Sequence, residues 1–491
     1  MGVANDAVNF LNSALGSKAA PRRVILWIAA AGILVGTLTS SGMMEVARSG
    51  VFYPGQFSFP EIMMLFLGMM LGNILLLDIY NTLGLPTSTT VSMVFGLLGA
   101  AVATALFRIA ADPSFSLHDL SQFINTGKAM VIIAAILVSV VFAFAAGTLF
   151  MYISRLIFSF RYHPAFRRWG AFWCGISLSG ILYFALFKGL KSSGLIPSDI
   201  TQYVGEHVLL TLFAFWAAAS LILWILQRMR FNIMRITILS GTFALALAFA
   251  GNDLVNFIGV PVAGFDAYSI AHRTGDASML MGALNENVPA NFLVLLAAGG
   301  VMIATLWTSK KSMHVSATEL SLSTQSDEGS EQQYGSSFFS RTIVRAALNI
   351  NAGVERVIPR RLRTAIAKRF EYEDIEHSGA PYDMIRATVN LTTSALLIAL
   401  ATSLKLPLST TYVSFMVAMG SSLADRAWGR ESAVYRISGV MTVVAGWFVT
   451  ALGGFLIAFV VGLALIYGGI PAFVLILSLI HISEPTRLRR I

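Results

Sequence analysis

The sequence predicts an all-α polytopic membrane protein built from two inverted-topology repeats with broken or re-entrant helical hairpins. Three observations predict it: the composition, the lengths of the apolar stretches, and two polar motifs that each occur twice in the same order. Of the 491 residues, 56% are hydrophobic and only 12% are charged, with a mean hydropathy of +0.73. Soluble chains carry about 25% charged residues, so the hydrophobic excess here has to face lipid.

Helices, rather than strands, are expected to cross the membrane, because no stretch alternates apolar and polar residues as the strands of an outer-membrane barrel do. Several stretches are apolar over about 17–25 residues, the length that a spanning helix needs. They are 24–44, 58–79, 129–152, 170–187, 207–226, 236–251, 291–307, 388–403, 437–458 and 459–476. Two further apolar runs, 88–107 and 409–423, begin at clusters of Pro, Ser and Thr, which predicts broken or re-entrant segments.

One long polar segment divides the apolar pattern. Its low-complexity start, 321–337, is expected to be disordered, and the mixed-charge part that follows is compatible with an amphipathic helix at the membrane surface. A solvated linker between two membrane halves is the simpler interpretation. We therefore divide the chain into 1–307 (first repeat, connecting spans and the start of the second repeat), 308–386 (cytoplasmic polar insert), 387–476 (remainder of the second repeat) and 477–491.

Positive charges predict the orientation. The net charge of +9 is spread over short clusters between apolar runs, which is typical of cytoplasmic loops rather than of a nucleic-acid-binding surface. All four clusters lie on the cytoplasmic side only if the segments 88–107 and 409–423 each cross the membrane once in net terms. The same topology puts 308–386 in the cytoplasm. The clusters are Lys18, Arg22 and Arg23; Arg155, Arg161, Arg167 and Arg168; Arg228, Arg230 and Arg235; and Arg426, Arg430 and Arg436.

The internal repeat rests on two duplicated motifs. VANDAVNF (3–10) returns as AGNDLVNF (250–257) with five of eight positions identical, and LPTSTT (85–90) returns as LPLSTT (406–411) with five of six identical. The two motifs are 82 residues apart in the first copy (Asp6 to Ser88) and 156 in the second (Asp253 to Ser409). The difference of 74 is close to the length of the polar insert.

The charge clusters indicate that the two copies are inverted. After the first Asn-Asp motif the chain emerges beside Lys18, hence inside, whereas after the second it emerges at 265–290, which the same topology places outside. Inverted repeats with interrupted helices are typical of secondary transporters, whose binding site lies near the midplane between the repeats.

The Asn-Asp motifs are candidate cation sites. Asp6 and Asp253 lie beside apolar stretches with no adjacent basic residue, and a carboxylate in the membrane usually lines a cavity, pairs or binds a cation. Asn9 and Asn256 each follow three residues later, on the same helix face. Carboxylate and amide oxygens on one face suit sodium or another hard cation. The alternative is that these side chains only form hydrogen bonds between helices. The second copy of the motif, at the matching position of the repeat, favours a cation site over this alternative.

The Pro-x-Ser-Thr-Thr clusters are candidate anion sites. Proline near a helix start with a capping Ser or Thr defines a helix N-terminus, which offers free backbone N–H groups, the positive dipole end and hydroxyl donors. An ordinary helix cap is the alternative for one copy, but two copies from opposite halves favour a shared oxyanion site. The residues are Ser88, Thr89, Thr90, Ser409, Thr410 and Thr411.

Several protein classes are disfavoured. The single cysteine, Cys174, excludes an internal disulfide framework and a Cys-based metal site. The sequence has no G-x-x-x-x-G-K-[ST] loop, which argues against ATP-driven transport by this chain. It also lacks H-E-x-x-H and G-x-S-x-G, which argues against a metalloprotease or a hydrolase. We therefore expect no catalytic residues, no enzyme activity and no resident cofactor.

With these residues assembled, the chain resembles the inorganic phosphate transporter (PiT) family over essentially all of its membrane part. The signature is the duplicated G-A-N-D-x-x-N-type motif, here VANDAVN and AGNDLVN, together with the duplicated P-x-S-T-T hairpins. The resemblance implies symport of phosphate with sodium or protons, in an inverted-repeat fold that holds phosphate between the hairpins.

The resemblance also implies roles for individual residues. It places the coupling cation, which can be sodium at Asp6 and Asp253, at Asp6, Asn9, Asp253 and Asn256. It places phosphate at Asn5, Asn252, Ser88, Thr89, Thr90, Ser409, Thr410 and Thr411. The expected partners are inorganic phosphate, sodium or a proton, the lipid bilayer and a second copy in a homodimer, but not nucleic acid. The expected location is the plasma (inner) membrane.

Both ends depart from the repeat. An apolar run, Ile236–Ala250, precedes the second Asn-Asp motif, whereas only Met1–Ala4 precedes the first, so we expect most of the first spanning helix to be missing. Leu477–Arg487 reads LSLIHISEPTR, which resembles a translated sequencing-library adapter, and 477–491 is set aside as an artefact. The sequence is therefore interpreted as a fragment.

Three other functions remain open at this point. The same scaffold could carry sulfate or another tetrahedral oxyanion, because hydroxyl and backbone donors suit both anions. A receptor or scaffold acting through 308–386 would not transport at all, but it has no reason to keep paired polar motifs within spans. An ion channel would lack saturable flux coupled to a gradient.

Overall fold

The computed structural model of the protein is helical throughout the part of the chain that it describes. The described residues are 2–38, 40–83, 87–184, 198–276, 278–286, 291–309, 320, 322, 341–342, 345, 359–370, 380–404, 406–425 and 430–488. Within these ranges there is no β-strand, only the isolated bridges Phe52–Ile124 and Ser58–Leu280. The prediction of an all-α polytopic protein is confirmed.

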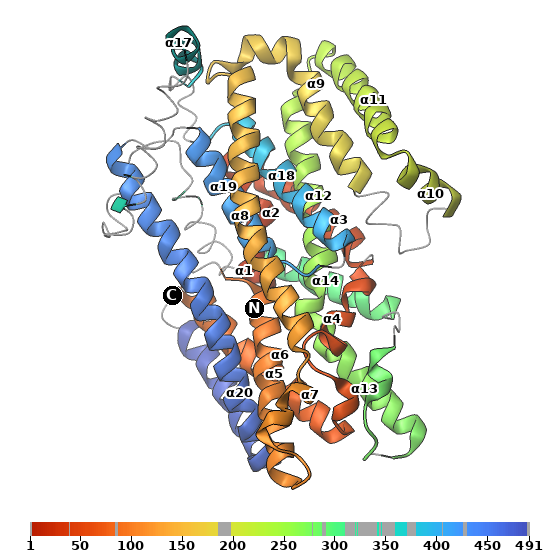
Figure 1. The fold of residues 1–491 in the computed structure, drawn as a ribbon. Coiled ribbons are helices and arrows are strands. Elements are labelled where there is room, and N and C mark those ends of the chain that lie inside the picture. The colour runs from red at the N-terminus through yellow and green to blue at the C-terminus, as the bar shows by residue number, and fades with distance from the viewer. Residues whose placement is uncertain are drawn as a thin grey trace.

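The helices follow the predicted apolar stretches closely (Figure 1). The α-helices are α1 (Gly2–Asp6), α2 (Val8–Gly16), α3 (Arg22–Leu38), α4 (Glu45–Ser49), α5 (Phe59–Leu83), α6 (Thr89–Ala111), α7 (Leu120–Phe123), α8 (Thr126–Ile157), α9 (Tyr162–Leu182), α10 (Ser198–Glu206), α11 (Val208–Arg228), α12 (Ile233–Leu254), α13 (Val260–Thr274), α14 (Phe292–Thr308), α17 (Arg360–Arg369), α18 (Met384–Ser403), α19 (Thr410–Ala424) and α20 (Arg430–Leu488). Short 3₁₀ turns are Ser40–Met43, Pro54–Gln56, Leu117–Asp119 and Gly282–Asn285, and Val255–Gly259 is a π-helix.

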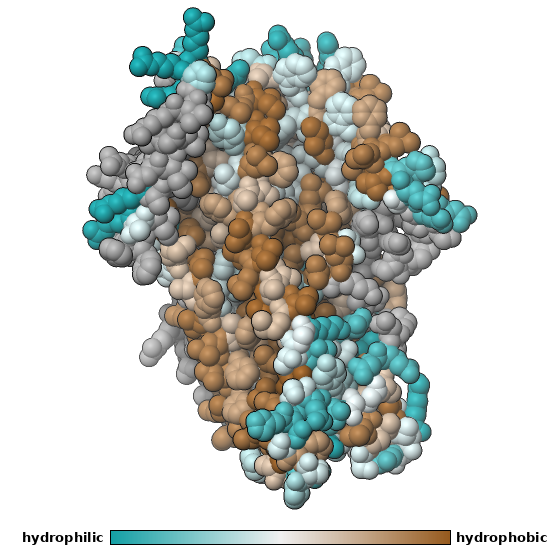
Figure 2. Space-filling view, in the orientation of Figure 1, coloured by the Kyte–Doolittle hydropathy of each residue, from teal (hydrophilic) through white to brown (hydrophobic). Residues whose placement is uncertain are grey.

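Seven helical segments of the described chain are long and apolar enough to cross a membrane. The outer surface supports this assignment, because hydrophobic residues cover the middle of the molecule while hydrophilic ones gather at its upper and lower ends (Figure 2). Large apolar side chains such as Leu209, Val141 and Phe448 are exposed. Such a belt is stable only in contact with lipid, so the protein is an integral membrane protein.

One predicted boundary is misplaced. The sequence separates two spans between 458 and 459, but α20 is continuous there and its non-helical residue is Gly469, with φ 52°. A positive φ is accessible to glycine without a steric penalty, and Pro471 cannot donate a helical hydrogen bond. Leu465 and Ile476, on either side of Gly469, belong to one apolar cluster, so the chain reverses direction at the glycine.

Two helical hairpins organise the core. α5 packs on α6 and α18 packs on α19, while α6 also packs on α20, and α19 on α8. Small residues allow these close approaches: a Cβ atom at Gly99 would lie 2.1 Å from the carbonyl oxygen of Phe455, and one at Gly420 would lie 2.3 Å from that of Phe144. α6 lies in the lower half of the molecule and α19 in the upper half, which supports an inverted arrangement of the hairpins (Figure 1).

The polar insert is described only in part. Its mixed-charge portion contains α17, a basic helix with no buried residue, which agrees with the helical interpretation of that portion. Phe370, which directly follows α17, stacks on Tyr152 of α8 with ring centroids 5.2 Å apart. Apart from Leu322, the low-complexity stretch 321–337 lies outside the described residues.

Candidate oxyanion and cation site

Both Asn-Asp motifs lie at irregular points in a helix. In the first copy α1 ends at Asp6 and α2 begins at Val8, with Ala7 between them. In the second copy Asp253 lies in the last turn of α12, directly before the π-helix. The backbone remains hydrogen-bonded across the first break, where the N–H of Ala7 donates to the carbonyl of Val3, and local π-helical turns like the second are frequent at functional sites.

The two Pro-x-Ser-Thr-Thr motifs form helix N-termini, as the sequence predicts. The hydroxyl of Ser88 accepts a hydrogen bond from the backbone N–H of Val91 at the start of α6. Ser409 does the same for Tyr412 at the start of α19. The first backbone N–H groups of both helices therefore point toward the buried centre, where the positive ends of the helix dipoles favour an anion.

Each buried carboxylate bridges the two hairpins. Asp6 accepts hydrogen bonds from Thr89 Oγ1 at 2.7 Å and from Thr411 Oγ1 at 3.0 Å. Asp253 accepts one from Thr90 Oγ1 at 3.0 Å and another from Thr410 Oγ1. The hydroxyls of the two Thr-Thr pairs thus each lie within hydrogen-bonding distance of an aspartate, although Thr90 Oγ1 also lies 3.2 Å from the carbonyl oxygen of Leu408, and each aspartate is shared by both hairpins.

The neighbouring asparagines complete this centre. Asn9 Nδ2 donates to Thr411 Oγ1 at 3.0 Å, and its Oδ1 accepts from Ser414 Oγ at 3.0 Å. Asn256 Nδ2 lies 2.7 Å from Asp253 Oδ1 and 2.9 Å from Thr90 Oγ1. Asn256 Oδ1 is buried and has no hydrogen-bond partner, which leaves a hard oxygen ligand available beside the Asp253 carboxylate.

Asn5 and Asn252 hold the hairpins from behind. Asn5 Oδ1 accepts from the backbone N–H of Thr87 at 2.9 Å, and Asn252 Nδ2 donates to the carbonyl of Leu408 at 2.8 Å. Thr87 and Leu408 are the third residues of the two LPxSTT motifs. These amides therefore position the hairpin tips, and Asn252 Nδ2 also lies 3.1 Å from Asp253 Oδ1 at the centre.

The electrostatics favour a bound cation. Asp6 and Asp253 are both fully buried, and neither forms an ion pair with a basic side chain of the described residues. Two unpaired carboxylates in a low-dielectric interior are costly, and a cation between carboxylate and amide oxygens would offset that cost. No group of three or more His, Cys, Asp or Glu residues suited to a metal occurs in the described chain. The oxygen atoms gathered here belong to Asp6, Asp253 and the neighbouring asparagines, a type of ligand that suits a hard cation.

The structure brings all twelve predicted site residues to this one region, and it adds three that sequence reasoning missed. Asn81 accepts from Asn5 Nδ2 at 2.9 Å, and Thr402 Oγ1 donates to Asn252 Oδ1 at 3.4 Å. Both lie four residues before the leucine of their hairpin motif, so alignment of the repeats could have found them. Ser414, the third, has Met93 as its counterpart, so repeat comparison gives no signal for it.

The chain is similar to known proteins in sequence and in fold. The chain is 28% identical over 317 residues to the "putative phosphate permease" of Thermococcus kodakarensis, covering 61% of this chain and 69% of that protein. It is 29% identical over 318 residues to the protein of the same name from Pyrococcus abyssi, with the same shares covered. A solved structure described as "The sodium-dependent phosphate transporter" shares the fold, with a TM-score of 0.63 over 94% of each chain and 16% identity.

The family itself is assigned from the sequence profile. The profile described as the phosphate transporter family, PHO4, matches residues 2–340, which is more than half of the chain. This is a family of transporters and not of enzymes, as the sequence predicts. The duplicated motifs, the fold and this match agree, and the chain belongs to the phosphate transporter family.

Proposed function

We propose that the protein is a secondary active transporter that imports inorganic phosphate together with sodium by alternating access. The observation that carries the proposal is the crossed pairing in which Asp6 and Asp253 each accept one hydroxyl from α6 and one from α19. This arrangement joins the cation ligands and the anion donors in one hydrogen-bonded unit.

The crossed pairing suggests how the two solutes are coupled. A hydroxyl group has one hydrogen to donate, and in this structure the four threonine hydroxyls donate it to the aspartates. A cation that binds the carboxylates neutralises their negative charge. The threonine hydroxyls can then rotate and donate their hydrogen bonds to an oxyanion. Phosphate would then receive hydroxyl and backbone N–H donors from both hairpins.

Binding without the cation is unfavourable for the same reason. Phosphate would approach two buried carboxylates while the threonine hydrogens are already committed, and desolvating an uncompensated anion costs tens of kcal/mol by Born-type estimates. Sodium is preferred over a proton because Asn256 Oδ1 offers an unpartnered oxygen, which can bind sodium directly. The sodium dependence named for the structural neighbour agrees with this choice.

The arrangement of the hairpins supports the proposal of alternating access. α6 and α19 begin at the shared centre and extend into opposite halves of the molecule (Figure 1). A rocking motion of one repeat against the other would uncover the centre from one side at a time. We place the protein in the plasma (inner) membrane with the insert in the cytoplasm, because the short arginine-rich loops then all lie inside.

Uptake of radiolabelled phosphate into proteoliposomes tests the function directly. We expect saturable uptake that requires an inward sodium gradient, is unaffected by a proton gradient alone, and is not competed by about a hundredfold excess of sulfate over phosphate. Uptake that ignores both gradients would remove the coupling, and equal competition by sulfate would remove the choice of phosphate.

A further inference from the structure

A buried polar stripe runs along one face of α19, away from the candidate site. Thr411, Ser414, Ala418, Ser421 and Asp425 are spaced by three, four, three and four residues, which places them on one side of the helix. All five are buried. The stripe therefore connects the threonine that contacts Asp6 with the carboxylate at the far end of the helix.

Each polar residue of the stripe has a polar partner on a neighbouring helix. Ser414 bonds to Asn9 of α2, as described above. Ser421 Oγ donates to Asn390 Oδ1 of α18 at 2.6 Å. Asp425 Oδ2 accepts from Arg386 Nη2 of α18 at 2.7 Å. The stripe is thus one side of a polar seam between α2, α18 and α19.

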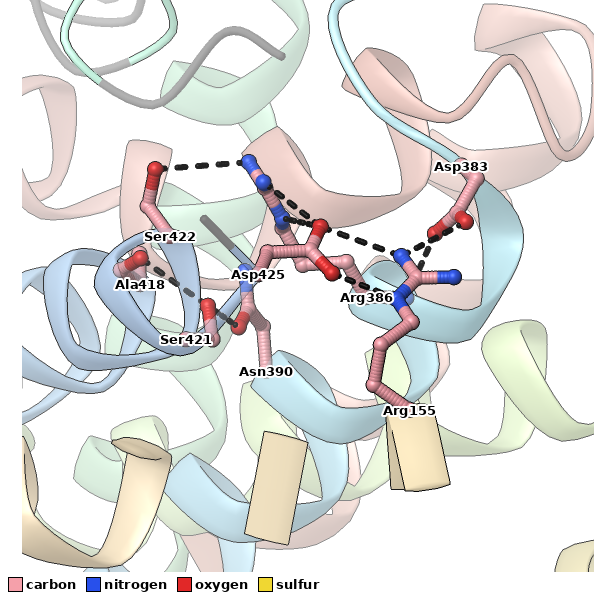
Figure 3. Close-up of polar contacts among 8 residues, drawn as sticks. All are labelled: Arg155, Asp383, Arg386, Asn390, Ala418, Ser421, Ser422 and Asp425. Atoms are coloured by element: carbon pink, nitrogen blue, oxygen red, sulfur yellow. Dashed lines mark hydrogen bonds and ion pairs between the residues drawn. The ribbon is translucent and has the colours of Figure 1, made fainter. Parts of the chain in front are cut away.

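The seam ends in a buried cluster of two arginines and two aspartates (Figure 3). Arg155 of α8 binds both Asp425 and Asp383, the latter at 2.8 Å, and Arg386 lies on the other side of Asp425. The side chains of Arg155, Arg386 and Asp425 have no exposed surface. The cluster closes the seam at the end of the molecule where α8 leads into the basic start of α9, with Arg161 as its N-cap and Arg167 in its second turn.

Several atoms along the seam are buried without any partner. Both amide atoms of Asn12, one turn beyond Asn9 on α2, are in this state, as are Asn390 Nδ2 and Arg155 Nη1. A buried polar group without a partner is unfavourable, and natural proteins keep one where a ligand, an ion or water meets it in another state. The seam therefore offers more hydrogen-bonding groups than this closed conformation uses.

The first repeat has no such seam. Aligned on the capping serines Ser88 and Ser409, the residues of α6 that correspond to Ser414, Ala418 and Ser421 are Met93, Leu97 and Ala100. These three are buried and apolar. Thr104, the counterpart of Asp425, is buried but donates to the carbonyl of Ala100 in its own helix, so the continuous stripe of polar contacts to neighbouring helices is a feature of the second hairpin.

We propose that this seam is the path by which phosphate leaves the central site toward the arginine-rich end, and that the Arg155–Asp425–Arg386 cluster is its gate. In the closed state Asp425 occupies the arginines, which are good ligands for a tetrahedral oxyanion. When the seam widens, phosphate replaces the carboxylate on the guanidinium groups before it reaches water. The inference rests on the proposed transport function and adds the route, the gate and their residues.

Cysteine accessibility tests the route. In a Cys174→Ala background, Ser421→Cys on the stripe is compared with Ala100→Cys, its buried counterpart on α6, and Arg168→Cys defines the arginine-rich side. The anionic reagent sulfonatoethyl methanethiosulfonate is added on that side of reconstituted protein. During sodium-driven phosphate uptake we expect Ser421→Cys to react about tenfold faster than Ala100→Cys, because the open state is a minor but recurrent one.

The outcomes separate the route from the function. Phosphate uptake by the Cys174→Ala parent is measured in parallel, and its absence would overturn the proposed function. Normal uptake with a Ser421→Cys that reacts no faster than Ala100→Cys would overturn the route. If Ser421→Cys itself loses uptake, the test is repeated with Ala418→Cys, on the same stripe one turn nearer the site. Its rate of reaction with the reagent is then compared with that of Leu97→Cys.

Discussion

At the scale of single residues, the central feature is that two aspartates share four threonine hydroxyls. The sequence predicted the participants, because a carboxylate beside an apolar stretch and a doubled Ser-Thr-Thr motif each have few other uses in a membrane. It did not predict the pairing, in which Thr411 reaches Asp6 and Thr90 reaches Asp253 across the repeats. Which hydroxyl meets which carboxylate depends on how the halves dock, and spacing along the chain does not contain that information.

Asp253→Asn should abolish sodium-dependent phosphate uptake. The amide is similar in size but carries no charge, so it keeps the fold while it weakens the cation site. We expect uptake to fall by at least about a hundredfold, the loss of roughly 2.7 kcal/mol of sodium affinity. The measurement is initial uptake against sodium concentration, with Asp276→Asn, an exposed loop residue, as the matched control. Wild-type uptake in Asp253→Asn would contradict the assignment.

Thr410→Ser and Thr410→Val separate the hydroxyl from the shape of the side chain. Serine keeps the donor to Asp253 and valine keeps the branched shape without it. We expect serine to retain most phosphate uptake and valine to raise the phosphate KM by about tenfold, the effect of one missing hydrogen bond. Equal uptake by the two variants would indicate that Thr410 only packs.

At the scale of helices, the spans were largely predictable and the breaks were not. Apolar length determined where each helix lies, because a membrane segment has to be helical to satisfy its backbone. The reversal in α20 was assigned near residue 458 instead of at Gly469 because hydropathy does not change at the glycine. The partners of the hairpins, α20 for α6 and α8 for α19, likewise depend on small residues whose close contacts appear only in three dimensions.

Gly99→Ala tests the tight contact between α6 and α20. The added Cβ would lie 2.1 Å from a carbonyl oxygen of Phe455, so we expect the free energy of unfolding to fall by about 1–3 kcal/mol. Gly300→Ala on α14, where nothing lies within 4 Å, is the control and should be neutral or stabilising by up to about 1 kcal/mol. The measurement is thermal unfolding in detergent, and a similar change in both variants would argue against close packing at Gly99.

At the scale of the whole molecule, the proposed mechanism makes the binding of the two solutes mutually dependent. If a cation releases threonine hydrogens for the anion, then by linkage the anion strengthens cation binding by the same factor. The described residues that carry this dependence come from both halves, so neither repeat alone provides a complete site.

Thermal stability should report this dependence without a transport assay. Sodium and phosphate together are expected to raise Tm by more than the sum of their separate effects, because each prepares the site for the other. Potassium phosphate and sodium sulfate provide the controls for cation and anion identity. Strictly additive shifts would mean that the two solutes bind independently.

The difference between Ser414 and Met93 has a further consequence. A carrier made of two equal halves would have isoenergetic resting states and would relax as readily toward one compartment as toward the other. Here the duplicated units have diverged: Asn81 stands where the second copy has Thr402, and α6 carries an apolar face where α19 carries a hydroxylated one. Such divergence makes the two orientations of the empty carrier unequal in free energy, so we expect different apparent affinities on the two sides of the membrane, whereas the solute gradients alone set the direction of net flux.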